Sequence, residues 1–199
     1  MTADARRDQL LDAALAIVVR EGYAAVSINA IARELDVTRP VVYNVFDGLD
    51  SLLHALLDRQ ERLALSQLLS RISVPTELPP DPSAYAKTTI ADLIAMVRED
   101  PSTWTPILLA GADTPPAVRE RIETDREAVR TRFQTLVETA LAHRPAAGLD
   151  ARVMSHALLA LAEYFGRLAL RDDGAADAQA IADTISTLLF ADPSRLATA

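Results

Sequence analysis

The chain has 199 residues, of which 50% are hydrophobic and 24% charged, and its formal net charge at pH 7 is −8. This length suits one moderate domain or a small domain joined to a larger one. The absence of cysteine excludes disulfides and thiolate metal sites, no apolar run reaches the ~18–20 residues of a membrane span, and the acidic balance argues against polyanion binding over the whole surface. The first residues lack the apolar core of a signal peptide, so we expect a cytoplasmic protein without membrane partners.

The first predicted helix runs from about Asp4 to Arg20 and stops at Gly22, a residue that commonly ends helices. Its apolar positions recur at helical spacing and predict one buried face. That face contains Leu10, Leu11, Ala14, Ile17 and Val18.

Residues 27–46 predict two short helices joined by a tight turn, and the rest of the chain is organised around them. Ser27 precedes the first apolar stripe, where its hydroxyl can cap the first turn. Thr38 is expected to cap the second helix, whose first turn contains Pro40. The predicted buried positions of the pair are Ile28, Ile31, Ala32, Leu35, Val37, Val42, Val45 and Phe46.

The opposite arc of the second short helix is small and mixed in chemistry, with Val41, Tyr43 and Asn44 after the exposed Arg39. A short helix that buries its back and exposes such a face suits readout of the DNA major groove, with Asn44 matched to adenine and Val41 to a thymine methyl. The alternative is an ordinary helical hairpin inside an all-α core.

Residues spread over positions 22–53 resemble the N-terminal domain of the tetracycline-repressor (TetR) family of regulators. They are Gly22, Tyr23, Ser27, Ile28, Ile31, Ala32, Val37, Thr38, Tyr43, Phe46, Leu52 and Leu53. The resemblance implies a homodimeric regulator that binds operator DNA and a small-molecule effector. Three positions depart from the pattern: Asp36 stands where the family usually has Gly, Val45 replaces a commonly polar or basic residue, and Leu49 replaces a Lys that usually holds a DNA phosphate.

The local charge opposes this expectation, because residues 1–55 contain five arginines and eight acidic residues, a balance of −3. The helix N-termini at Ser27 and Thr38 offset part of this missing positive charge, because their backbone N–H groups can bind phosphates. The residues expected to contact DNA are Ser27, Asn29, Thr38, Arg39, Pro40, Val41, Tyr43 and Asn44.

Beyond residue 48 the pattern is helical throughout, with no β pattern and no internal repeat. Apolar spacing and Pro or Gly breaks predict helices at residues 49–72, 83–99, 104–108, 116–143, 149–171 and 176–190. This pattern predicts an all-α protein, and the resemblance implies a helix-turn-helix DNA-binding domain at residues 1–48 and a ligand-binding and dimerisation domain at residues 49–199. The helix at residues 49–72 links the two.

The helix at residues 149–171 carries one bulky apolar face and one face of small side chains. With the helix at residues 176–190 it is expected to form a four-helix interface between two copies of the chain. The residues expected there are Ser155, Ala162, Gly166, Ala169, Ile185 and Leu188. The alternative is that both faces pack within one subunit.

No catalytic or metal-ligand motif is present: G-x-G-x-x-G, a P-loop, G-x-S-x-G and H-E-x-x-H are all missing. We expect no enzyme activity, no catalytic residue, no metal and no cofactor. An apolar interior with a few polar groups is typical of effector pockets. Tyr85, Met96, Trp104, Phe133 and Tyr164 are expected to line one here, although aromatic and Met residues at helical spacing also suit a plain core.

These observations together predict a ligand-responsive transcriptional repressor that a small hydrophobic effector releases from its operator. The alternative function is a helical partner-binding or scaffold protein with weakened DNA binding. The balance of −3, Val45 and Leu49 favour that alternative.

Overall fold

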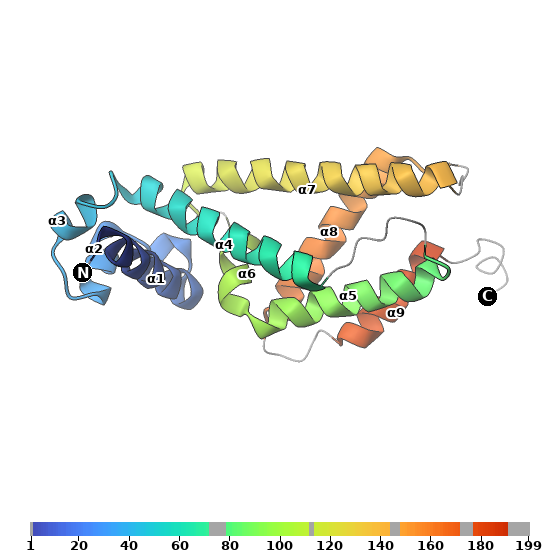
Figure 1. Ribbon diagram of the computed structural model, residues 1–199, viewed down its shortest axis with the longest axis horizontal. Coiled ribbons are helices and arrows are strands. Elements are labelled where there is room, and N and C mark those ends of the chain that lie inside the picture. The colour runs from blue at the N-terminus through green and yellow to red at the C-terminus, as the bar shows by residue number, and fades with distance from the viewer. Residues whose placement is uncertain (1, 72–78, 112–113, 144–147, 172–176, 191–199) are drawn as a thin grey trace. The chain divides into compact units, whose positions relative to one another are not determined.

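The computed structural model describes residues 2–71, 79–111, 114–143, 148–171 and 177–190, and every regular element among them is helical (Figure 1). In chain order the elements are α1 (Ala3–Glu21), the 3₁₀ turn η1 (Tyr23–Ala25), α2 (Ile28–Glu34), α3 (Arg39–Tyr43), α4 (Leu49–Arg71), α5 (Pro82–Glu99), α6 (Pro101–Leu108), α7 (Pro116–His143), α8 (Ala151–Ala169) and α9 (Ala178–Phe190). The predicted all-α class is confirmed, and the predicted ranges of the long helices agree closely with these bounds.

The chain forms two compact units that do not coincide with two continuous stretches of sequence. The first contains residues 1–65 and 101–128, and the second contains residues 66–100 and 129–199. Both α4 and α7 therefore contribute residues to each unit. The functional boundary predicted at residue 48 stays a prediction.

The first unit is built on the apolar face of α1, and the predicted stripe of this helix is confirmed. Its core also takes in side chains from α2, α3, α4 and the start of α7. The most deeply buried are Leu10, Ala14, Ile31, Val42, Leu52, Leu53, Leu56 and Val118, each fully shielded from solvent.

A buried tyrosine joins the η1 turn to α6 inside this unit. The Tyr23 hydroxyl donates to the carbonyl oxygen of Pro106 over 2.9 Å. Burial, and then the nearby Glu61 carboxylate, raise the pKa of Tyr23, so the phenol keeps the proton that it donates. The contact pairs a polar group that would otherwise be buried without a partner.

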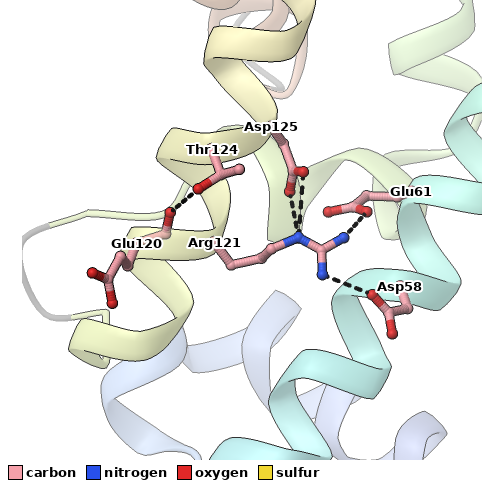
Figure 2. Close-up of polar contacts among 6 residues, drawn as sticks. All are labelled: Asp58, Glu61, Glu120, Arg121, Thr124 and Asp125. Carbon is pink, nitrogen blue, oxygen red and sulfur yellow. Dashed lines mark hydrogen bonds and ion pairs between the residues drawn. The ribbon is translucent and has the colours of Figure 1, made fainter.

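One arginine on α7 binds three carboxylates in the first unit (Figure 2). Arg121 Nη1 lies 3.0 Å from Asp58 Oδ1, Nη2 lies 2.6 Å from Glu61 Oε2, and Nε lies 3.0 Å from Asp125 Oδ2. Asp58 and Glu61 belong to α4, so the guanidinium ties the start of α7 to that helix.

On another side, α4 is tied to α1 by Arg59, whose Nη1 lies 2.7 Å from Asp12 Oδ1. Consecutive positions of α4 thus carry ion pairs to two different helices. Such pairs add little when exposed, but here Arg59 and Glu61 are partly shielded from water. They fix the rotation of α4 against its neighbours in the first unit.

In the second unit α5 packs against α8 and α9. Lys87 on α5 pairs with Asp183 on α9, and Arg130 on α7 donates to the Ser155 hydroxyl on α8 over 3.0 Å. The apolar side chains of α7 differ in burial between the two units. Val118 and Ile122 are buried in the first unit, whereas Val129 and Leu136 in the second are 38% and 51% exposed.

The Arg121 cluster predicts a pH dependence of stability. Burial first, and then the hydrogen bond and charge of Asp125, raise the pKa of Glu61 from 4.5 to about 7, against the opposing effect of Arg121. The folded chain therefore holds a proton that the unfolded chain has released, and the free energy of unfolding falls as pH rises from about 4.5 to about 7.

Glu61→Gln should remove this part of the pH dependence, because the amide cannot ionise. Urea unfolding of the variant and the parent at a series of pH values across this window measures the effect. Glu123→Gln is the matched control, since Glu123 lies on α7, two residues after Arg121, with its side chain 74% exposed. If the parent and Glu61→Gln lose stability equally across the window, Glu61 is not the titrating group.

Candidate nucleic-acid interface

The geometry of the two short helices follows from their caps and their buried residues. The Ser27 hydroxyl accepts from the Ala30 N–H over 3.1 Å, which confirms the predicted cap of α2. Thr38 occupies the predicted N-cap position of α3, but its side chain makes no capping hydrogen bond. Val42 at 0% and Phe46 at 2% exposure anchor α3 to the core.

The turn between α2 and α3 depends on a residue with an uncommon backbone conformation. Asp36 has a φ of 51°, in the left-handed region that Gly adopts most readily. An L-residue there costs about 1 kcal/mol, and Asp is tolerated because its short polar side chain can bond locally. The Val37 N–H still donates to the carbonyl of Ala32 over 2.9 Å, so the tight turn forms without glycine.

The residues expected to contact DNA divide into an exposed set and a partly buried set. Asn29, Thr38, Arg39, Pro40, Tyr43 and Asn44 are exposed, and the ring of Tyr43 is 54% exposed. Ser27 and Val41 are partly buried. On α3 the exposed residues occupy the arc opposite the buried Val42, so their side chains are available to a groove.

Two of the departures from the family pattern have a structural reason. Val45 and Leu49 are partly buried and pack against the core of the first unit. Leu49 therefore packs at the edge of the core. Neither side chain can neutralise a DNA phosphate.

Several charges in this region are paired with one another. Arg20 bonds to Glu21 over 2.8 Å and to Glu34 over 3.1 Å, and Asp12 is paired with Arg59. All eight acidic residues of 1–55 are exposed, and the five outside these ion pairs are Asp4, Asp8, Asp36, Asp47 and Asp50. The negative balance is therefore divided between paired carboxylates and these five.

The residues expected to line an effector pocket belong to both units. Trp104 is buried in the first unit. In the second unit Met96 is 2% exposed, Tyr85 and Phe133 are partly buried, and Tyr164 is 57% exposed with its ring edge-on to Phe165 at 5.3 Å between centroids.

The residues expected at a dimer contact are mostly inward-facing in the single chain. Ser155, Gly166, Ala169 and Ile185 are buried, Ala162 is exposed, and the side chain of Leu188 lies outside the described residues. Large apolar groups are exposed on another face of α8 instead, namely Val153, Leu161 and Tyr164.

A buried amide on α4 was not anticipated from the sequence. Gln60 is 1% exposed, and within the described part of the chain its Oε1 accepts no hydrogen bond. The sequence pattern did indicate this burial, because Gln60 is at helical spacing from the buried Leu53, Leu56 and Ala64. An unpaired buried acceptor costs about 1–3 kcal/mol, which a donor from water or a ligand would offset.

Other kinds of site find no support in the part of the chain that the structure describes. Its helices are not long and apolar enough to cross a membrane. It also contains no group of three or more acidic or histidine side chains placed to hold a metal ion.

Residues 10–56 match the sequence profile of the "Bacterial regulatory proteins, tetR family". Among solved structures, a TetR-like transcriptional regulator from Rhodococcus sp. RHA1 superposes with a TM-score of 0.72 and 18% identity, over 100% of both chains. AibR in complex with isovaleryl coenzyme A and operator DNA superposes with a TM-score of 0.69 and 21% sequence identity, over 93% of this chain and 98% of that one. The fatty acid degradation regulator FadR from Bacillus halodurans superposes with a TM-score of 0.67 and 16% sequence identity, over 92% of this chain and 94% of that one. No curated protein matches the sequence.

Proposed function

We propose that this chain is a TetR-type transcriptional regulator whose α3 enters the DNA major groove, with Tyr43 and Asn44 facing the bases and Arg39 near the backbone. The observation that carries the proposal is the exposed mixed arc of α3 above a fully buried Val42. Asn makes a bidentate contact to adenine, and a helix held from behind can present it in a fixed orientation.

Operator binding is tested by selecting duplexes from a random pool with the purified chain and measuring affinity for the enriched sequence. Asn44→Ala should relax the preference at one base position per half-site and cost about 1–3 kcal/mol there. Asn29→Ala, on the exposed face of α2, provides a comparison at another expected contact. If Asn44→Ala and the parent have the same base preferences, Asn44 does not contact the bases. If the selection enriches no duplex, the scaffold alternative is favoured.

We further propose that two copies of the chain associate through the exposed apolar face of α8. Val153, Leu161 and Tyr164 lie at positions i, i+8 and i+11 of this helix, and they are 67%, 37% and 57% exposed. An apolar face of this kind is stabilised when a second copy covers it, and a two-fold contact uses the same patch on both subunits. The small face of α8 then packs within each subunit.

Leu161→Glu should shift the chain toward monomers, because it places a charge at the centre of an apolar contact. Sedimentation velocity measures the change, and circular dichroism shows whether the helices remain. Arg152→Glu, at an exposed position of the same helix, is the control and should leave the dimer intact. If the Leu161→Glu variant remains dimeric, the dimer interface does not lie on this face of α8.

For the effector we propose a small hydrophobic molecule whose polar end bonds to the Gln60 amide. The amide can donate to a carbonyl and accept from an N–H or O–H group. Coenzyme A thioesters are the first candidates, because AibR is solved with isovaleryl coenzyme A and the FadR structure concerns fatty acid degradation. Their acyl chain is hydrophobic, and a pantetheine amide N–H can donate to the unpaired Gln60 Oε1. The effector would favour a different spacing of the two α3 helices, which must lie about 34–36 Å apart to reach successive major grooves.

Isovaleryl coenzyme A should change the emission of Trp104, the single tryptophan of the chain, and release the selected duplex over the same concentration range. The two effects must coincide because binding of the effector and binding of DNA are linked. Free coenzyme A is the matched control, and Gln60→Leu should raise the concentration of thioester that is needed. Release of DNA without any change in emission separates the effector site from Trp104.

A further inference from the structure

An arginine near the start of α1 is held by an aromatic ring at the far end of the DNA-reading motif. The guanidinium carbon of Arg7 lies 4.6 Å from the centroid of the Phe46 ring. Arg7 is exposed, whereas Phe46 is 2% exposed and lies three residues beyond Tyr43, the last residue of α3. The cation is therefore fixed next to the turn that leaves the recognition helix.

The way in which Arg7 is held leaves its hydrogen-bonding edges available. Stacking on a ring engages the flat face of a guanidinium, while its N–H donors point outward in the plane. Arg20 and Arg59 are different, since carboxylates occupy their N–H groups. In the described residues Arg7 makes no ion pair with a carboxylate.

We propose that Arg7 is a phosphate-binding residue of this chain, held in place by Phe46 and directed at the DNA backbone beside the C-terminal end of α3. The proposal rests on the proposed function and assigns a further residue to the same interface. With five residues α3 is about 7.5 Å long, and the major groove is about 12 Å wide. A group just beyond the end of that helix therefore meets the strand that borders the groove.

The local charges make such a contact necessary on this side of the motif. Asp47 and Asp50 are exposed around the turn after α3, and Leu49 between them is packed against the core. A phosphate that approaches this turn is repelled by two carboxylates unless a cation lies beside it. Arg7 supplies that charge from α1, and Arg forms planar paired bonds to phosphate oxygens.

The test is the salt dependence of DNA binding, measured with a labelled duplex enriched by selection with the purified chain. Each phosphate contact contributes about 0.9 to the slope of log K against log salt, so Arg7→Gln should lower the slope by about 0.9 per bound chain, or about 1.8 per dimer. Sequence preference should not change, because phosphate contacts position a protein without specifying bases. Arg132→Gln, an exposed arginine of α7 in the second unit, corrects for the change in net charge and should keep the parent slope.

Two further variants separate phosphate binding from a role in the fold. Arg7→Lys keeps the charge but loses the flat stack, so it should bind more weakly than the parent with an unchanged slope. Phe46→Leu should behave in the same way if it folds, and thermal melting of every variant reports on folding. A parent slope in Arg7→Gln overturns the proposal while operator binding stands, whereas a parent chain that binds no selected duplex overturns the proposed function itself.

Discussion

The burial of Val42 and Phe46 is the constraint on which the DNA-reading surface depends. With these two side chains in the core of the first unit, α3 has one possible rotation, and Tyr43 and Asn44 must face outward. A five-residue helix has no stability of its own, so packing from behind sets both its existence and its orientation. The apolar side of the helix thereby decides which polar groups of α3 are exposed.

Much of the fold could be predicted because helical spacing is a local signal. The stripe of α1, the cap at Ser27 and the breaks at Gly22 and the prolines all depend on residues close in sequence. The contacts of Arg121 could not be predicted in this way, because Asp58 and Glu61 lie sixty or more positions away along the chain. The small face of α8 was ambiguous for a related reason: periodicity identifies a face that packs closely, but it does not say whether the neighbour is the same chain or another copy.

The candidate interface shows how a count of charges differs from their arrangement. A balance of −3 in residues 1–55 argued against DNA binding, yet Glu21, Glu34 and Asp12 are paired with arginines. From the sequence, two departures were interpreted as missing DNA contacts, at Val45 and Leu49. In the structure both side chains pack against the core. Composition reports none of this, since pairing and burial are properties of positions in space.

The strained turn at Asp36 constrains how this chain can vary. A residue with φ near 51° admits Gly or Asn without difficulty, while β-branched side chains clash with the backbone there. A single change at this position, to Gly or Asn, would therefore remove one negative charge from the turn between α2 and α3 without straining its backbone.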